Sequence, residues 1–168
     1  MEPLRVWTLH CKSVWMNMTY QEKSLNRSVL HLLYRAMQCA SNMFEGEIDV
    51  MTPRQFAVLA ALDNLEDGAS QAMLTKQTGI DRSTLSEVVQ RLLAKGFVAR
   101  RRSPTDRRAY TVKLTRQGRA RLSSVRPAVD RVDEHVMSMV PTRQRDAFVS
   151  ALTSLAENCE KRRGGEAD

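Results

Sequence analysis

The sequence has no apolar run long enough to cross a membrane, and its beginning lacks the continuous apolar stretch of a secretory signal peptide. Arg5, His10 and Lys12 interrupt the short apolar pieces there. We therefore expect a cytoplasmic protein, with residues 1–22 forming a leader outside the folded domain. Met16 and Met18 are alternative starts, which leaves open whether residues 1–17 are in the native protein.

Cysteine and histidine are scarce, with three residues of each type: Cys11, Cys39, Cys159, His10, His31 and His135. An odd, sparse set of cysteines argues against a disulfide framework, and no pair has the spacing of a zinc site. The sequence also lacks a phosphate-binding loop and a Ser/His/Asp order, and neither His31 nor His135 has an evident acid partner. We therefore predict no cofactor, no metal and no enzymatic activity.

Positive charge, in contrast, is abundant and concentrated. Residues 82–119 hold eleven Lys and Arg against two acids, a net charge of +9. The remaining sequence carries 15 basic and 17 acidic residues, a net charge of −2. A solvated surface would explain an arbitrary basic patch, whereas one cationic block in a mildly acidic chain fits a polyanionic partner. The local architecture decides between the two interpretations.

The first half of the chain shows two helical patterns. Apolar residues recur at helical period from Ser24 to about Glu45, and Gly46 and the polar residues after it are expected to end that helix. Thr52 has the properties of an N-cap for the next helix, with Pro53 at the first helical position and a glutamine three residues after the cap. The Asp-Gly pair at 67–68 is expected to end this second helix.

Two short helices then follow, at about 70–78 and 82–95, with Gly79 in the turn and Asp81 or Ser83 as the cap of the second one. Two helices joined by such a turn form a helix-turn-helix unit, whose second helix can enter the major groove of DNA. The second helix has an apolar stripe of Leu85, Val88, Val89, Leu92 and Leu93. Its opposite face is polar.

Residues 97–102 and 109–114 have the pattern of two strands, and Ser103 to Asp106 supply turn chemistry between them. Gly96 is placed to end the preceding helix. The result is a hairpin with an arginine-rich tip, which is a wing. Thr115 is expected to cap a long helix that reaches about Met139, and a last helix is expected to begin at residues 141–142.

The middle of the chain resembles the MarR family (multiple-antibiotic-resistance regulator type), in the run TGIDRSTLSEVVQRLLAKGFVARRRSPTDRRAYTVKLTRQGRARL. Three features carry the resemblance: DRST at Asp81–Thr84, LLAKGFVARR at Leu92–Arg101, and the wing from Ser103 to Gly118. MTPRQFAVLAAL also looks like the family's second helix. The resemblance covers roughly residues 25–160, and Thr75 departs from the alanine that is usual in the family.

The resemblance implies a mainly α fold with a small β-wing: a winged helix-turn-helix with a helical dimerisation region. It implies a domain at 23–163, in which 23–50 and 116–163 are dimerisation helices and 52–115 is the DNA-binding lobe, followed by a tail at 164–168. The implied partners are double-stranded DNA, a second copy of the chain and a small-molecule effector. The expected function is a ligand-responsive repressor, released from a pseudo-palindromic operator by an aromatic or anionic effector such as an aromatic acid or its acyl thioester. Alternatives are a non-specific or architectural DNA-binding protein, and a regulator that senses oxidants through a cysteine.

The predicted DNA contacts lie on the recognition helix and the wing. On the helix, short hydroxyls can hold phosphate, Arg can bond guanine and Gln can bond adenine, which selects Arg82, Ser83, Thr84, Ser86, Gln90 and Arg91. On the wing, Arg101, Arg107 and Arg108 are candidates, because a minor groove concentrates negative potential. In similar proteins the acid at Asp106 pairs with an arginine and orients the wing. The alternative for the helix residues is a polar, capping surface.

Candidate ligand-binding residues mix aromatic, thioether and cationic groups: His31, Tyr34, Arg35, Met43, Arg54 and Phe56. An ordinary dimer core is the alternative for each of them. Cys39 is interpreted as a packing residue, with oxidant sensing as the alternative.

Overall fold

The computed structural model describes the backbone of residues 27–102 and 110–165. Within these ranges it describes the side chains up to residue 159 and that of residue 161. The leader expected at 1–22 and the wing-tip residues Asp106, Arg107 and Arg108 lie outside the described residues. The chain divides into two compact units, residues 1–40 and 41–168, and the boundary falls within the helix α2 (Val29–Glu47).

The described part of the first unit is the beginning of α2. Ser28 is its cap, because the Ser28 hydroxyl accepts from the His31 amide over 3.4 Å and the Ser28 carbonyl accepts from the Leu32 amide over 2.9 Å. The helix therefore begins at Val29, later than the predicted start at Ser24. Large apolar side chains of this segment are exposed within the chain: Val29, Leu30, Leu32, Leu33, Tyr34 and Met37.

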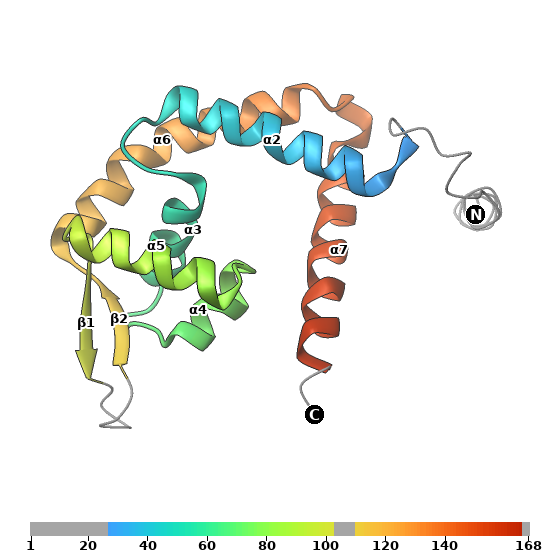
Figure 1. The fold of residues 1–168 in the computed structure, drawn as a ribbon. Coiled ribbons are helices and arrows are strands. Elements are labelled where there is room, and N and C mark those ends of the chain that lie inside the picture. The colour runs from blue at the N-terminus through green and yellow to red at the C-terminus, as the bar shows by residue number, and fades with distance from the viewer. Residues whose placement is uncertain (1–26, 103–109, 166–168) are drawn as a thin grey trace. The chain divides into compact units, whose positions relative to one another are not determined.

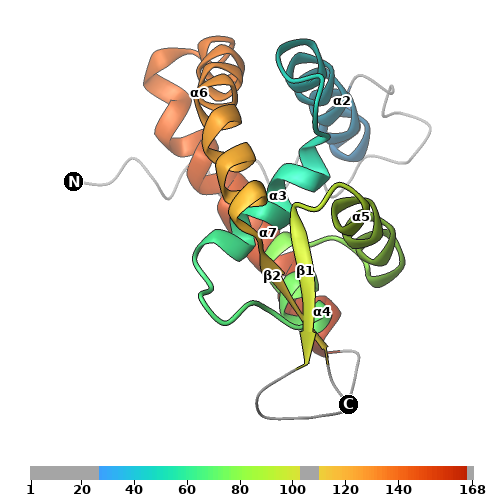
Figure 2. The ribbon, with the colours of Figure 1, turned by 90° about the vertical axis from the view of Figure 1, so that its left-hand side faces the viewer.

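The second unit continues α2 and then follows the predicted order of elements (Figures 1 and 2). These are α3 (Pro53–Asp63), α4 (Gln71–Thr78), α5 (Arg82–Ala94), β1 (Val98–Arg102), β2 (Tyr110–Leu114), α6 (Arg116–Ser138), the short 3₁₀ helix η2 (Thr142–Gln144) and α7 (Arg145–Gly165). The fold is thus mainly α with a small β-wing, as predicted. None of the helices described here is long and apolar enough to span a membrane.

Side-chain caps begin the helices where the sequence predicted them. The amide of Gln55 donates to the Thr52 hydroxyl over 3.3 Å and the Thr52 amide donates to the Gln55 side-chain oxygen over 3.4 Å, a complete capping box with Pro53 at N1. Ser70, Asp81 and Thr115 cap α4, α5 and α6, and each side chain accepts one bond from the amide three residues later. Each cap satisfies an amide that the first turn leaves without a helical partner.

The end of α2 agrees with the prediction, whereas the predicted end of α3 is wrong. The helix α2 ends at Glu47, one residue after Gly46, and the Ile48 amide still bonds the Phe44 carbonyl over 2.8 Å. The helix α3 ends at Asp63, before the Asp-Gly pair at 67–68. The chain must leave the helix early because Ala69 pairs with Val112 in the sheet.

The core of the second unit joins α3, α4, α5 and the start of α6. The predicted stripe of α5 is buried except for Leu93, which is partly buried, and it packs with side chains from the neighbouring helices. Among those, Leu59, Leu62, Leu74 and Leu122 are almost fully buried. Gly79 ends α4 in the left-handed conformation (φ +67°), which allows the sharp turn between the two helices of the helix-turn-helix. The buried stripe fixes which side of α5 faces solvent.

The strands β1 and β2 form an antiparallel hairpin in the register Val98–Leu114, Arg100–Val112 and Arg102–Tyr110. Ala69 extends this sheet on the other side of β2, exchanging backbone hydrogen bonds of 2.9 and 2.8 Å with Val112. Figure 2 shows the two strands β1 and β2 side by side. The base of the hairpin is buried at Val98 and Leu114, while its distal residues are exposed. The hairpin is therefore anchored in the core at one end only.

Candidate nucleic-acid interface

One side of α5 is available for contact with a partner. Arg82, Ser83, Gln90 and Arg91 are exposed, and Thr84 and Ser86 are half-buried. The opposite side is held by the buried stripe of Leu85, Val88, Val89 and Leu92. All six predicted recognition-helix residues thus lie outside the core, on a helix whose orientation is fixed by packing. Their contact with DNA stays a prediction.

The N-cap of α5, Asp81, lies at the end of the helix where DNA contact by Arg82, Ser83 and Thr84 is predicted. Asp81 Oδ1 accepts from the Ser83 hydroxyl over 2.6 Å and from the Thr84 amide over 2.9 Å. These bonds, the Ser83 hydroxyl first, hold the pKa of Asp81 well below its usual range. Since the Ser83 proton serves the cap, Ser83 presents its lone pairs outward. The capping interpretation holds for this residue in the free chain.

The three arginines of β1 are all exposed, although they alternate along the strand. Arg100 and Arg102 lie on the sheet face shared with Val112, and Arg101 lies on the face shared with Thr111. They are exposed on both faces because the hairpin extends beyond the core. Arg101 is therefore accessible on the wing, and its contact with DNA stays a prediction.

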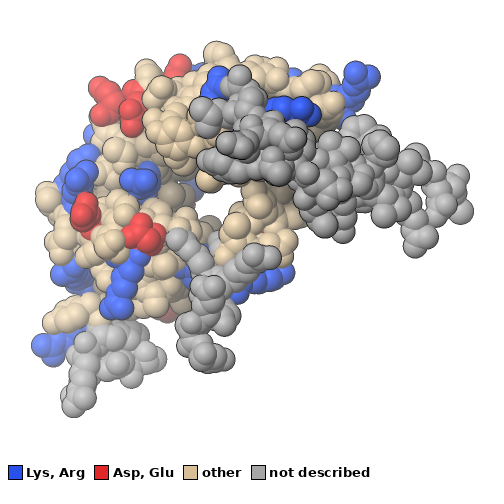
Figure 3. All heavy atoms as spheres, turned by 45° about the vertical axis from the view of Figure 1, so that its right-hand side comes forward, with Lys and Arg blue, Asp and Glu red and all other residues tan. Residues whose placement is uncertain are grey.

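Two cations of the basic block are used inside the fold. Arg119 Nη1 lies 2.6 Å from Asp63 Oδ1, and Lys95 Nζ donates to the Val50 carbonyl over 3.0 Å. Among the side chains that the structure describes, no carboxylate forms an ion pair with these other cations of the block: Arg82, Arg91, Arg100, Arg101, Arg102, Lys113 and Arg116. Figure 3 shows Lys and Arg side chains on the surface close to where the hairpin leaves the helices.

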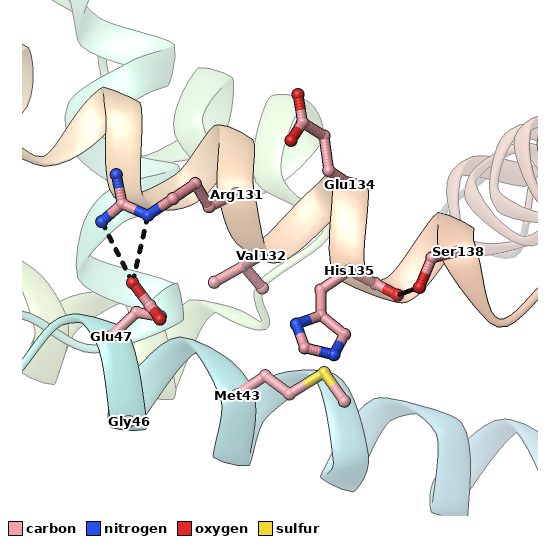
Figure 4. A pocket seen from close by; sticks show the side chains of 8 residues that line it. All are labelled: Met43, Gly46, Glu47, Arg131, Val132, Glu134, His135 and Ser138. Atoms are coloured by element: carbon pink, nitrogen blue, oxygen red, sulfur yellow. Dashed lines mark hydrogen bonds and ion pairs between the residues drawn. The ribbon is translucent and has the colours of Figure 1, made fainter.

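A cavity of about 670 Å³ lies between the end of α2 and the end of α6, lined by Met43, Gly46, Glu47, Arg131, Val132, Glu134, His135 and Ser138. Arg131 crosses it and donates to Glu47 Oε2 from Nη2 over 3.0 Å and from Nε over 3.3 Å (Figure 4). The His135 ring points from α6 toward Met43 on α2, whereas Glu134 points the other way. The cavity is open and combines one cation, carboxylates, an imidazole and a thioether.

The sequence profile of the MarR family matches residues 51–109. The repressor NicR of Pseudomonas putida is 31% identical over 138 residues, which are 81% of this chain and 87% of NicR. The chain belongs to the MarR family. It is a DNA-binding transcription regulator, and regulators of this family are homodimers.

Solved structures agree with this assignment. Bordetella bronchiseptica BpsR is 31% identical, with a TM-score of 0.75, and the match covers 80% of this chain and 96% of BpsR. The DNA binding of BpsR is regulated by 6-hydroxynicotinic acid. The repressor CouR bound to a 23-mer DNA duplex is 30% identical with a TM-score of 0.70, over 79% of this chain and 94% of CouR. The MarR fold thus extends over both the winged lobe and the flanking helices.

The predicted ligand residues of this MarR-family protein are distributed over different places. Met43 lines the cavity, Phe56 packs on Phe44 with ring centroids 6.0 Å apart, and Arg54 is exposed at the start of α3. His31, Tyr34 and Arg35 lie about one turn apart on α2 in the first unit, with Tyr34 and Arg35 exposed. Ligand binding by these six residues stays a prediction.

Other lining residues of the cavity were not found by sequence reasoning, namely Glu47, Arg131 and His135. Arg131 and His135 lie four residues apart and therefore share one side of α6. That spacing was a usable signal, but nothing in the sequence indicated that this side of α6 faces the end of α2. Tertiary packing alone brings Glu47 to Arg131.

Cys39 is a free, exposed thiol on α2, as is Cys159 on α7. Cys39 is thus not part of the core of this chain, and packing within a dimer interface stays a prediction for it.

Arg91 lies on a flank of α5 and lines a second cavity, of about 630 Å³. The other residues that line this cavity are Glu45, Ile48, Asp49, Met51, Thr52, Gln55, Ala94 and Lys95. Arg91 and Lys95 share this flank because they are one turn apart. The centre of the exposed side lies nearer to Ser83 and Gln90.

Proposed function

We propose that this MarR-family regulator is a dimeric repressor that binds a pseudo-palindromic operator through α5 and the wing. The exposed, cationic side of α5 and β1, opposite a fully buried stripe, is the observation that carries the proposal. In a twofold dimer, two such helices enter successive major grooves about one helical turn, or ~34 Å, apart. DNA as the partner agrees with the cytoplasmic location expected from the sequence.

Dimerisation is proposed for the helices outside the lobe, within the segments 23–50 and 116–163, which flank a DNA-binding lobe at 52–115. Every side chain of α7 from Asp146 to Cys159 is exposed, including the large apolar ones at Phe148, Val149, Leu152 and Leu155. An apolar row on an otherwise polar helix is typical of an interface. The exposed apolar residues at the start of α2 support the same proposal.

Within the interface, we assign base contact to Arg82 and Gln90, since their side chains match guanine and adenine in the major groove. Ser83, Thr84, Ser86 and Arg91 are assigned to the DNA backbone near the helix. Arg101 is assigned to the wing, together with Arg107 and Arg108, which the sequence places at the undescribed tip with the orienting Asp106.

The footprint of the purified protein on the DNA upstream of its own gene tests this function. A protected palindrome and a steep fall of affinity with salt are expected, because Lys and Arg that contact phosphates release counterions. Competition with random duplex DNA supplies the control. Equal affinity for both duplexes would favour the architectural alternative over a sequence-specific repressor.

The effector is proposed to be a small aromatic acid or its thioester, bound in the α2–α6 cavity. Its volume of about 670 Å³ fits the size range of small-molecule sites. An acidic group of the ligand would take Arg131 from Glu47, and Glu47 would then accept from a donor group of the ligand. The effect of 6-hydroxynicotinic acid on the 31% identical BpsR supports this class of ligand.

Release of the DNA would follow from differential binding. A ligand that fits one arrangement of α2 and α6 better than another shifts the population toward the first. If that arrangement has the wrong spacing between the two recognition helices, the affinity for the operator falls. The repressor would then leave the operator without any direct contact between ligand and DNA.

Arg131→Gln is the variant that tests the cavity, with operator release by a panel of aromatic acids as the readout. We expect the variant to bind the operator as the wild type does and to respond at least tenfold less to the ligand, because a charge-assisted bond to the ligand is lost. Arg126→Gln is the matched control on the same helix, since Arg126 pairs with Asp63 instead. An unchanged response of Arg131→Gln would remove the cavity from the proposal.

A further inference from the structure

The recognition helix carries a single acidic residue, Glu87, which the functional assignments above leave unused. Glu87 is exposed, and it lies four residues after Ser83 and three before Gln90. These spacings place the three side chains on one side of the helix, opposite the buried stripe. Glu87 is therefore at the centre of the exposed side of α5, where the predicted DNA contacts gather.

The carboxylate of Glu87 has no ion-pair partner among the described residues. Arg91 follows at the spacing at which Glu and Arg commonly pair on a helix, yet the two do not pair here. Glu87 is also outside the cap, which is made by Asp81. Neither helix capping nor an ion pair within the described residues therefore accounts for an acid at this position.

A carboxylate on this surface carries an electrostatic cost. Phosphates of the DNA backbone repel it, and a fixed negative charge within a block of net charge +9 reduces the attraction that the block provides. Glutamine or serine at this position would avoid the cost. The acid must therefore meet a group other than phosphate if it contributes to binding.

The edges of the bases in the major groove offer such a group. An ionised carboxylate can only accept hydrogen bonds, so it is repelled by the acceptors of guanine and thymine. Cytosine presents its N4 amino group as a donor without an adjacent acceptor of its own. Adenine pairs its N6 donor with the N7 acceptor, which makes it the poorer partner for a carboxylate.

We infer that Glu87 is a specificity-determining residue that accepts a hydrogen bond from N4 of a cytosine in each operator half-site. The inference rests on the proposed function and refines it, because it names a base that the recognition helix selects. Gln90, three residues after Glu87, then contacts a neighbouring base of the same half-site, and Ser83, four residues before Glu87, contacts the DNA backbone. The same negative charge that phosphates repel then disfavours thymine and guanine at this position, because both bases present acceptors in the major groove.

Selection from a random duplex library, with the full-length protein and its Glu87→Gln and Glu87→Ala variants, tests the inference. The wild type is expected to enrich one cytosine in each half-site that Glu87→Ala no longer selects, with the other positions unchanged. Glu87→Gln is expected to shift that position toward adenine, which an amide can bond twice. Glu66→Gln is the control, since Glu66 is an exposed acid in the turn after α3.

The affinities supply a second readout. Replacing the selected cytosine by thymine is expected to weaken wild-type binding about tenfold and Glu87→Ala binding by less than about twofold. If Glu87→Ala instead binds every duplex more tightly with an unchanged preference, Glu87 is merely a repulsive surface charge and the inference is wrong. If the wild type enriches no sequence at all, the proposed function fails, and this inference fails with it.

Discussion

The side-chain ammonium of Lys95 donates a hydrogen bond to the backbone carbonyl of Val50 over 3.0 Å, which ties the end of α5 to the link between α2 and α3. A second bond of 3.3 Å reaches the side-chain oxygen of Gln55, which is 4% exposed and completes the capping box of α3. The link begins directly after the last turn of α2, where Gly46 and Glu47 line the cavity. One lysine thus connects the recognition helix to a wall of the proposed effector site.

Lys95→Met keeps the length and apolar body of the side chain and removes both hydrogen bonds. We expect the free energy of unfolding to fall by about 1 kcal/mol, and the release of operator DNA by the effector to weaken. Urea unfolding and an operator-release titration measure the two effects. Lys76→Met, at an exposed site in the last turn of α4, is the control and should change neither by a comparable amount.

Asp63 holds two arginines of α6, with Arg119 at 2.6 Å and Arg126 at 2.7 Å. Since both guanidinium groups are about half exposed, solvent screens the pairs. Asp63→Asn should lower the free energy of unfolding by at most about 1 kcal/mol. The loss should shrink when unfolding is repeated at high salt, because added ions screen the wild-type pairs. A loss that is independent of salt would assign the effect to packing.

Thr75 carries a buried hydroxyl without a hydrogen-bond partner in the described part of the chain. Thr75→Ala removes this unsatisfied group and favours the helix, so we expect the free energy of unfolding to rise by about 1 kcal/mol. Thr78 lies in the same helix, but its hydroxyl donates to the Leu74 carbonyl over 2.7 Å. Thr78→Ala should therefore not stabilise the protein, and equal gains from both variants would contradict this reading of Thr75.

The depressed pKa of Asp81 predicts how stability depends on pH. The folded state favours the carboxylate, so the stabilisation by Asp81 is complete above its unfolded pKa, near 4. It is lost progressively as the pH falls from there toward the lower folded pKa. The difference in unfolding free energy between wild type and Asp81→Ala should therefore be large at neutral pH and shrink below about pH 4. A difference that is constant down to pH 2 would contradict the cap as its origin.

Gly118 lies where the start of α6 meets the carbonyl of Phe97, and a Cβ added there would be 1.9 Å from the Phe97 oxygen. Gly118→Ala should therefore lower the free energy of unfolding by about 1–3 kcal/mol, because backbone must move. Gly46→Ala is the matched control in α2, where a Cβ would meet nothing within 4 Å. It should instead raise the stability by about 0.5–1 kcal/mol through better helix propensity.

Local signals in the sequence predicted the helix-turn-helix and the hairpin well. Thr52, Ser70, Asp81 and Thr115 carry their own capping chemistry, so they mark the starts of helices without knowledge of the fold. The end of α3 could not be predicted in this way. It depends on the pairing of Ala69 with Val112, which lies more than forty residues away in sequence.

The cavity could be predicted least. Arg131 meets Glu47 across 84 positions of sequence, and only the packing of α6 against α2 brings them together. The basic block was recognised from the number of Lys and Arg in residues 82–119. That number does not reveal that Lys95 and Arg119 form contacts within the chain, with Val50 and Asp63. Sequence patterns report which residues share a helix face, whereas partners on other elements require the fold.

The bridge between Ala69 and Val112 has a consequence for solubility. Because Ala69 occupies the far side of β2, the open side of the described sheet is that of β1, which carries Arg100, Arg101 and Arg102. An open strand edge is a template on which other chains can aggregate, and adjacent positive charges repel a second copy of the same edge. The arginines that suit a polyanion therefore also keep unbound wings of different molecules from joining edge to edge.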